Sequence, residues 1–381
     1  MSSISLHQIA TKKVCCQRVD AIDPAVLSNQ SQTLEPKHTM TCQLPLSYSV
    51  HRDGHQFFLG KSVDQFNCNY TFQARDLVAL PRARLIDSSW AIVSYDNYLF
   101  SDSYFNKQLL QKSGSFLENN LKLNIDGQLQ EIPFALYKND LARNVVNTAC
   151  YLPLYAWHHN YHHWLIECLP MILEYINAPF FNNCKIIMPS QPNLFQKATL
   201  EILDIPEDKI VYFDEQDSQF TLLYSPSLGN FSPRQLQAIR HQFFTKLGIT
   251  GPRPERLLYV SRKDARERQI SNESEIQDYL ISRGFEILHL TGKPLAEQIR
   301  LFSQAKVIIG PHGAGLSNAI FAPKECTLVE LLPDDNVNMC FWLLANSLGL
   351  AFTYLVGQVN GSERRFGIEM PMLKQLVEEI V

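Results

Sequence analysis

The chain of 381 residues lacks the features that mark several large classes of protein. It has no run of about 18 to 20 apolar residues that could span a bilayer, and its N-terminus lacks the apolar core of a signal peptide. It has no basic stripe, and a formal net charge of -4 argues against a general nucleic-acid binder. With 45% hydrophobic and 19% charged residues, the composition predicts a soluble, cytoplasmic globular protein.

Short motifs of several site types are missing as well. The nine cysteines form no C-x-x-C pair, and their odd number and irregular spacing argue against a disulfide framework or a zinc ribbon. The zinc-protease motif H-E-x-x-H, the dinucleotide fingerprint G-x-G-x-x-G and the P-loop are also absent. The absence of the dinucleotide fingerprint argues against an NAD-dependent oxidoreductase, although the chain has the right alternation of strands and helices.

That alternation is the main signal of fold class. Short buried strands are followed by amphipathic helices from about residue 158 to the end of the chain, which predicts parallel sheets with crossover helices. One of these helices has Asn272 and Glu275 spaced as a capping box at its start and Gly284 at its end. The predicted class is therefore α/β.

We divide the chain into five parts. Residues 1–40 are polar and weakly periodic, as expected of a partly ordered arm, and 41–248 predict an α/β domain that begins with a β-meander. Residues 249–256, with two prolines and a glycine, predict a hinge. Residues 257–368 predict a Rossmann-like domain, and 369–381 a C-terminal helix that could return to the N-terminal domain.

A histidine-rich helix is predicted at "HHNYHHWLIECLP". At helical spacing His162 points into the apolar face, so we expect it to be buried and hydrogen-bonded. His159, His163 and Glu167 lie one turn apart along the edge of that face. They could bind a metal, act as acid and base, or lie at a helix–solvent boundary. Pro170 should break or kink the helix beyond Glu167.

A glycine-rich turn is predicted between a buried strand and a short helix, in "KVIIGPHGAGLSNAIFA". Gly310, Gly313 and Gly315 allow backbone N–H groups to approach an anion at the start of the helix, and His312 could contact a phosphate. Glu330, near the end of the following strand, could accept hydrogen bonds from ribose hydroxyls or take a structural role.

A basic stretch leaves another strand in "YVSRKDARERQISNE". Such a charge run is often only a solvated loop, but at the same sheet edge as the glycine turn its guanidinium groups could clamp a diphosphate. Arg262, directly after the strand, is the main candidate. The other basic residues of the stretch are Lys263, Arg266 and Arg268.

These three motifs, in this order, resemble glycosyltransferase family 61, whose bacterial members include capsular polysaccharide biosynthesis proteins. The matching segments read "NYHHWLIECLP", "VSRKDARERQISNE" and "GPHGAGLSNAIF", and the resemblance runs from about residue 78 to 332. It implies a GT-B-like fold: two Rossmann-like domains facing a cleft, with a strand-rich N-terminal extension. The N-terminal domain would bind the acceptor and the C-terminal domain the nucleotide-sugar.

The resemblance also implies an activity, which is the inverting transfer of a hexose or pentose from a nucleotide-sugar, UDP being the expected nucleotide. His163 falls on the motif histidine, and Glu167 keeps the carboxylate of the motif, so either one or both could be the catalytic base. No metal is expected, because D-x-D is absent. The implied donor-binding residues are Arg262, Arg268, His312, Gly313, Ala314, Gly315, Asn318 and Glu330.

Two other functions stay open at this point. A metal-dependent hydrolase could use the His158–His163 cluster, and a family member without activity could simply bind glycans. The expected partners are a nucleotide-sugar donor and a glycan, glycolipid or protein acceptor, with no nucleic acid and no cofactor. Peripheral contact with a membrane and the oligomeric state stay open.

Overall fold

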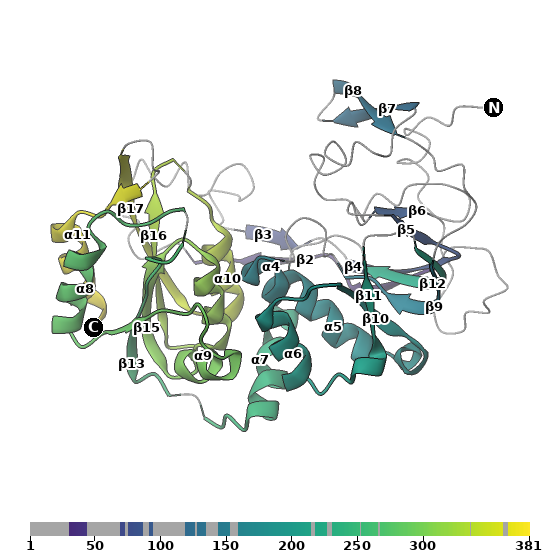
Figure 1. The fold of residues 1–381 in the computed structure, drawn as a ribbon. Helices are drawn as coiled ribbons and strands as arrows, with labels where there is room; N and C mark the ends of the chain where they lie inside the picture. Colours follow the sequence, from purple (N-terminus) through teal and green to yellow (C-terminus); the bar gives the residue numbers. More distant parts are fainter. Residues whose placement is uncertain are drawn as a thin grey trace.

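A computed structural model gives the fold (Figure 1). Predictions for residues 1–29, for most of the β-meander, for His158 and for Arg266 fall outside the part of the chain that it describes. The described residues are 30–43, 69–72, 75–86, 91–93, 119–125, 128–134, 144–152, 159–214, 218–226, 231–251, 253–265, 267–335, 337–360 and 365–381.

The first sheet has eight strands in the order β1-β4-β12-β9-β10-β11, with β5 and β6 attached through β12. Strands β12, β9, β10 and β11 are parallel, and β1 and β4 are antiparallel additions at one edge. The strands are β1 (Gln30–Glu35), β4 (Arg75–Pro81), β5 (Arg84–Ile86), β6 (Ala91–Val93), β9 (Asn144–Cys150), β10 (Lys185–Pro189), β11 (Ile210–Phe213) and β12 (Ser218–Pro226). Its helices are α4 (Tyr161–His163), η6 (Trp164–Cys168), α5 (Leu169–Ile176), η7 (Pro179–Asn183), α6 (Leu194–Ile202), η8 (Glu207–Lys209) and α7 (Pro233–Leu247).

The second sheet has six strands in the order β14-β13-β15-β16-β17-β18, parallel except for β18. Mixed α/β architecture with parallel sheets is therefore confirmed. The strands are β13 (Arg256–Val260), β14 (Glu286–Leu288), β15 (Ala305–Pro311), β16 (Thr327–Pro333), β17 (Ala351–Asn360) and β18 (Arg365–Gly367). Its helices are α8 (Glu273–Ser282), α9 (Leu295–Phe302), η9 (Ala314–Phe321), α10 (Cys340–Leu348) and α11 (Met370–Ile380).

Helices cover both faces of the second sheet, as a parallel sheet requires. Helices α8 and α11 pack on the outer face, against Val307, Ile309 and Val329. The alternate strand residues, such as Ile308 and Leu328, face α9, η9 and α10 and belong to the same core as α5 and α7 of the first half. In Figure 1 these helices lie between the two sheets. One hydrophobic core therefore runs through both halves.

Two local predictions were wrong. The C-terminal helix does not return to the first half: α11 buries Leu373 and Val377 against the second sheet because its apolar face matches the face that α8 leaves open. Asn272 makes no side-chain cap on α8. Its amide instead donates to the Ile368 carbonyl at 2.8 Å and accepts from the Ile368 N–H at 3.1 Å, so it bonds the segment after β18 rather than its own helix.

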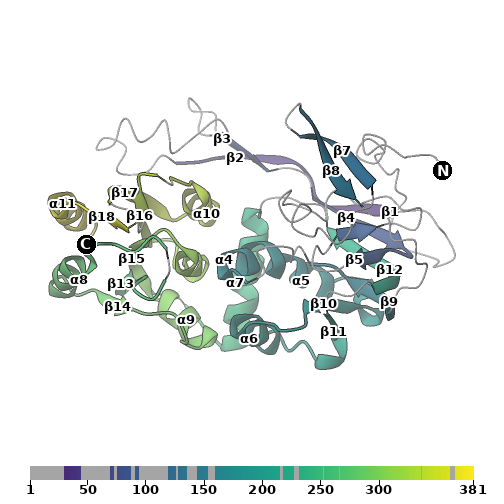
Figure 2. The same cartoon turned by 45° about the horizontal axis from the view of Figure 1, so that its top comes forward.

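Two antiparallel two-stranded sheets complete the described chain. Strands β2 (His38–Thr41) and β3 (Asn69–Phe72) form one, and β7 (Asn119–Ile125) and β8 (Gln128–Phe134) form the other. Figure 2 shows β2 and β3 extending from the edge of the first sheet toward α10. Just after β2, the Gln43 carbonyl accepts from Trp342 Nε1 at 2.8 Å, and the Gln43 N–H donates to Asn346 at 2.5 Å. The segment predicted as an arm therefore contains β1 and most of β2, and the chain just beyond it contacts the second half through Gln43.

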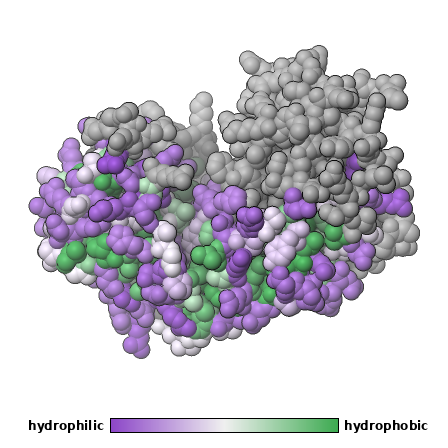
Figure 3. All heavy atoms as spheres, in the orientation of Figure 1, coloured by the Kyte–Doolittle hydropathy of each residue, from purple (hydrophilic) through white to green (hydrophobic). Residues whose placement is uncertain are grey.

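The surface carries separate hydrophobic patches among hydrophilic residues on the face shown in Figure 3. Within the described residues, none of the helices has both the length and the apolar character needed to cross a membrane.

Candidate functional site

The candidate site begins where the second sheet reverses its order. From β13 the chain adds β14 on one side, then crosses to place β15 on the other side. In open α/β sheets, ligands bind outside the carboxyl ends of the two strands at this switch point. Arg262 follows β13 by two residues, and His312 directly follows β15. The two residues predicted to hold a phosphate therefore flank the switch point.

The glycine turn brings these two elements into close contact. A Cβ atom built on Gly313 would lie 1.8 Å from Arg262 Nη1 and 2.6 Å from its Cζ, so the guanidinium rests on the bare backbone of the turn. Gly310 likewise allows a close approach, here between β15 and β13: an added Cβ would be 3.0 Å from the Val260 carbonyl oxygen. A side chain at position 313 would therefore have to displace the guanidinium, whereas the extended backbone of Gly313 does not itself require glycine.

Arg262 is one of two guanidinium groups beside the turn. Its Nη2 donates to the Glu267 carbonyl at 3.2 Å. Burial lowers the pKa of Arg262, and the positive charge of Arg268 lowers it further. The Nε atoms of both arginines are buried and have no hydrogen-bond partner within the described part of the chain. Two cations therefore stand close together, each with an Nε donor that none of the described residues uses.

His312 is held by Glu330. His312 is buried, with its side chain 9% exposed, and its Nδ1 lies 2.5 Å from Glu330 Oε1. Glu330 lies opposite Gly310 in the β15–β16 ladder and is 0% exposed. Burial raises the pKa of Glu330, which the hydrogen bond and charge of His312 and the charge of Arg268 partly offset. Its carboxylate faces the histidine inside the protein, not the surface where a ribose would lie.

The histidine helix meets the glycine turn directly. Tyr161 Oη donates to Asn318 Oδ1 at 2.8 Å, and His162 Nδ1 lies 2.7 Å from Ser317 Oγ. Ser317 and Asn318 are both fully buried in η9. His162 is hydrogen-bonded, as predicted, but half-buried rather than fully buried. Its pKa is lowered to about 3 by burial, with smaller contributions from His163 and His312.

Four aromatic rings connect the two predicted parts of the site. Neighbouring rings stand edge to face, with centroids 5.4 Å apart in each pair: His163 with His162, His162 with Phe341, and Phe341 with His312. Phe341 is 1% exposed and comes from the first turn of α10. The row of rings places the histidine helix beside the switch point, although about 150 residues of sequence separate the two motifs.

His163 and Glu167 form a partly exposed pair at the other end of this row. His163 Nδ1 lies 2.8 Å from Glu167 Oε1, and the side chains are 29% and 33% exposed. Between them the helix widens to a π-helical segment, η6, whose last bond runs from the Leu169 N–H to the Trp164 carbonyl. The predicted break at Pro170 takes this form. Such widened turns are frequent at functional sites.

Three other residues predicted to bind the donor, Ala314, Gly315 and Asn318, belong to η9, and Gly315 and Asn318 contact other parts of the protein. The Asn318 amide is used completely: besides accepting from Tyr161, it donates to Gln298 at 3.1 Å and to the Gly315 carbonyl at 3.2 Å. A Cβ on Gly315 would meet Leu290 and Val260 at 3.1 Å, so this glycine faces the protein core. Ala314 begins η9.

The structure also identifies residues that the sequence patterns did not single out. Tyr161, Ser317 and Phe341 join the two motifs through contacts across the fold, and no local pattern predicts such contacts. His159 is exposed and lies 3.3 Å from Asn193. In the described part of the chain, no group of three histidine, cysteine or acidic side chains could hold a metal ion. His158 lies outside the described part.

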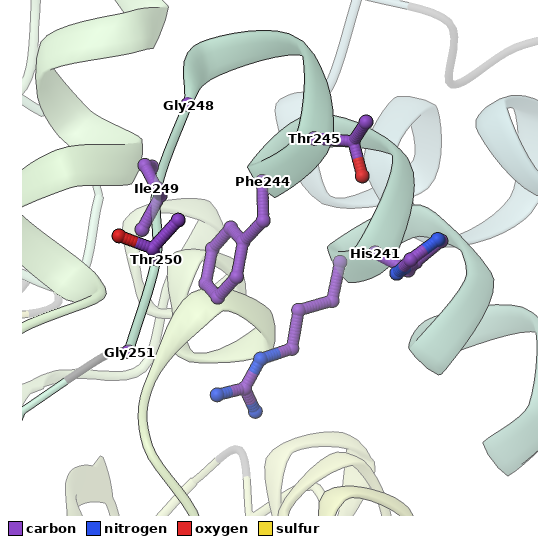
Figure 4. A pocket seen from close by; sticks show the side chains of 8 residues that line it. His241, Phe244, Thr245, Gly248, Ile249, Thr250 and Gly251 are labelled. Atoms are coloured by element: carbon purple, nitrogen blue, oxygen red, sulfur yellow. The ribbon is translucent and has the colours of Figure 1, made fainter.

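A separate open pocket of about 660 Å³ lies at the end of α7 and the start of the connection to β13 (Figure 4). Arg240 and Phe244 form one wall, with the guanidinium carbon 5.2 Å from the ring centroid. None of the predicted site residues lines this pocket.

The fold and the site define an α/β protein with a positively charged site at the switch point of a parallel sheet. Residues 161–329 match the family model of Glycosyltransferase 61, which confirms the resemblance over that segment of the chain.

Three curated relatives, all from Oryza sativa subsp. japonica, are similar to the chain. Alpha-1,3-arabinosyltransferase XAT2 is 29% identical over 30% of the chain and 21% of that protein. Beta-1,2-xylosyltransferase XAX1 is 33% identical over 26% of the chain and 17% of that protein. Alpha-1,3-arabinosyltransferase XAT3 is 30% identical over 29% of the chain and 19% of that protein. The match thus spans about a fifth of each relative's length, and all three are named as pentosyltransferases. Over the matched segment, the chain is therefore similar to enzymes that are named as glycosyltransferases.

Proposed function

We propose that the protein is an inverting glycosyltransferase of GT-B type that needs no metal. It transfers a sugar from a UDP-sugar to a hydroxyl group of a glycan, glycolipid or protein. The observation that carries this proposal is the row of rings from His163 to His312. It sets a partly exposed imidazole–carboxylate pair beside a cluster of cations, and glycosyl transfer needs a base and an anion site within reach of one sugar.

The donor diphosphate would lie at the switch point. When the bond from the anomeric carbon to the diphosphate breaks, negative charge develops on the leaving phosphate. Arg262, Arg268 and the ring of His312 can stabilise that charge, together with the N–H groups of the turn at Gly313. Three cationic or protonatable groups provide the positive charge that a metal supplies in other transferases. Asn318, whose amide is fully engaged, would position η9 and would not touch the donor.

The acceptor hydroxyl would be activated on the opposite side of the sugar. Its oxygen forms the new bond to the anomeric carbon, its proton passes to His163 or Glu167, and the diphosphate leaves with the bonding electrons. Attack from the face opposite the leaving group inverts the anomeric centre. A base in such a step contributes about 10²- to 10⁴-fold to the rate. The relatives' names favour a pentose, such as xylose or arabinose, as the transferred sugar.

Titration calorimetry with UDP, GDP and ADP, with and without EDTA, tests the donor site first. UDP should bind equally well with the chelator, and Arg262→Ala should weaken UDP binding about tenfold or more, since it removes charge-assisted hydrogen bonds. Arg256→Ala is the matched control: Arg256 lies at the opposite end of β13, paired with Glu286, and its loss should leave UDP affinity unchanged. Affinity that disappears with EDTA would favour a metal-dependent enzyme instead.

Activity is tested by release of free UDP from UDP-xylose and UDP-arabinose over a panel of glycan acceptors. Acceptor-dependent release, with a β-linked product from an α-linked donor, supports inverting transfer. Binding of UDP without release from any pair would indicate a glycan-binding member of the family. A product that keeps the donor's anomeric configuration would contradict the proposed mechanism.

A further inference from the structure

The contact between Glu330 and His312 is the strongest feature of the site for which the proposed reaction gives no role. The carboxylate is completely buried, and Oε1 bonds Nδ1 of the ring at 2.5 Å. Oε2 has no hydrogen-bond partner within the described residues. A buried carboxylate is costly unless another charge or donor compensates for it. Glu330 cannot bind a ribose hydroxyl in this position because no part of it reaches the surface.

A carboxylate beside one ring nitrogen of a histidine determines which nitrogen carries the proton. A carboxylate that accepts from Nδ1 fixes the orientation of the ring and keeps a proton on Nδ1, in the neutral as well as the charged form. Nε2 is then the nitrogen left for a ligand. When the ring takes a second proton at Nε2, the adjacent carboxylate stabilises the resulting cation.

The other charges around the ring make this stabilisation necessary. Arg262 rests on Gly313, the residue next to His312, and Arg268 lies near enough to Glu330 to lower its pKa. Two guanidinium groups oppose protonation of a third group beside them. The carboxylate offsets that repulsion. The titratable and charged groups that face the His312–Glu330 pair are Arg262 after β13, Arg268 in the loop before α8, His162 on α4 and the Cys340 thiol at the start of α10.

We propose that Glu330 is a positioning residue that acts through His312, holding the ring protonated and its Nε2–H directed to the β-phosphate of the donor. This inference rests on the proposed function for the identity of the ligand, but not for the state of the ring. The diphosphate would thus meet a cluster of three cations balanced by one buried carboxylate, and its affinity would fall as pH rises and His312 loses the Nε2 proton.

The state of the ring is measured in the free protein, by ¹⁵N NMR of the histidines with His312→Asn to assign the signal. At high pH the wild-type ring should carry its proton on Nδ1 and none on Nε2. A proton on Nε2 in the neutral ring would overturn the proposal without any change at Glu330. This experiment needs no nucleotide, so it stands even if the proposed function is wrong.

Glu330→Gln then tests the charge. The amide has the shape of the carboxylate but no charge, and the midpoint of His312 titration should fall by about 1 to 3 pH units. Glu297→Gln is the control, because Glu297 is an exposed carboxylate of the same half that pairs with Lys293. It should leave the titration of His312 unchanged. An unchanged midpoint in a folded Glu330→Gln protein would overturn the proposal.

Binding of UDP and of inorganic pyrophosphate from pH 5.5 to 8.5 connects the ring to the ligand. In the wild type, both should bind more weakly as His312 loses its proton, and in Glu330→Gln this loss should begin at a pH lower by the same shift that NMR gives. If binding depends on pH in the same way in both proteins, the proposal that the Nε2–H of His312 is directed to the β-phosphate is wrong. If the wild type binds neither probe, the proposed function fails, and the NMR result still decides the role of Glu330.

Discussion

His163 and Glu167 form a hydrogen-bonded pair, with Nδ1 and Oε1 2.8 Å apart, across the single π-helical segment in the described part of the chain. The backbone between them is fixed: Trp164 is fully buried and its Nε1 donates to Thr199 Oγ1 at 3.1 Å. A buried anchor beside a partly exposed pair keeps the imidazole in one place while both groups can meet an acceptor. Nδ1 is taken by the carboxylate, so Nε2 is the nitrogen that can accept a proton.

Removing either member of this pair should reduce the transfer rate and leave donor binding intact. We expect His163→Gln to lower kcat about 10²- to 10⁴-fold. Glu167→Gln should cost less if the carboxylate only orients the ring, and as much if it is the base itself. The UDP affinity of both variants should stay within about twofold of the wild type, because the donor cations lie elsewhere. Initial rates and titration calorimetry give the two quantities.

His159→Gln is the control for that experiment, because His159 precedes the same helix but contacts Asn193 instead. Its rate should match the wild type. If His163→Gln and Glu167→Gln react as fast as the wild type, the pair does not take part in catalysis.

A methyl group at Gly313 should displace Arg262. Since a Cβ there would lie 1.8 Å from Nη1, the guanidinium must move away from the turn in Gly313→Ala. We expect UDP affinity to fall about tenfold or more, as in Arg262→Ala. A double-mutant cycle checks the mechanism. If the methyl group acts by displacing the arginine, Gly313→Ala should add little to Arg262→Ala. Additive losses would show that the glycine serves the turn itself.

Much of this fold follows from the sequence because its signals are local. Runs such as those of β15 and β16 are mostly apolar, as expected of strands buried on both faces, and the helix at Met370–Ile380 has a clear apolar face. Parallel order then brings the ends of β13 and β15 together. The positions of Arg262 and His312 at one sheet edge were therefore predictable from two separate motifs.

Contacts between distant segments could not be predicted in the same way. Glu330 was expected near the end of a strand, where many carboxylates meet ligands. It lies in the middle of β16, and only the packing of His312 against it shows that it faces inward. Asn272 has the spacing of a cap but finds a stronger pair of partners in the Ile368 backbone, 96 residues away. The contact of Gln43 with α10 uses the backbone N–H and carbonyl of Gln43, which carry no sequence signal, and the side chains of Trp342 and Asn346.

The hydrogen bond from Tyr161 to Asn318 should contribute to stability. The two atoms are 2.8 Å apart, and Asn318 is fully buried. Tyr161→Phe leaves the Asn318 oxygen without its donor, at a cost of about 1 to 3 kcal/mol. The melting temperature should therefore fall. Asn318→Asp should destabilise more, because it buries a charge among neutral partners. Phe195→Leu is the control, since Phe195 touches the edge of the Tyr161 ring without bonding its hydroxyl. If Tyr161→Phe and the wild type melt at the same temperature, the bond contributes nothing.

His162 should make the protein less stable in acid. Its pKa is about 3 in the folded protein, mainly because it is removed from water, and about 6.5 in an unfolded chain. Below pH 6.5 the unfolded chain therefore binds the proton more readily than the folded protein does. Stability is lost progressively as pH falls from about 6.5 toward 3, by at most about 1.4 kcal/mol per pH unit for this one group.

His162→Gln removes that proton-binding group and keeps a side chain that can bond Ser317. The difference between its melting temperatures at pH 7 and pH 4.5, at constant ionic strength, should be smaller than in the wild type. His289→Gln removes an exposed histidine just after β14 and should behave as the wild type does. Burial raises the pKa of Glu330, and this favours the folded protein as pH falls. The effect is the same in all three proteins, so it cancels when their melting temperatures are compared. An equal loss of stability in the wild type and His162→Gln would show that protonation of other groups, and not of His162, destabilises the protein in acid.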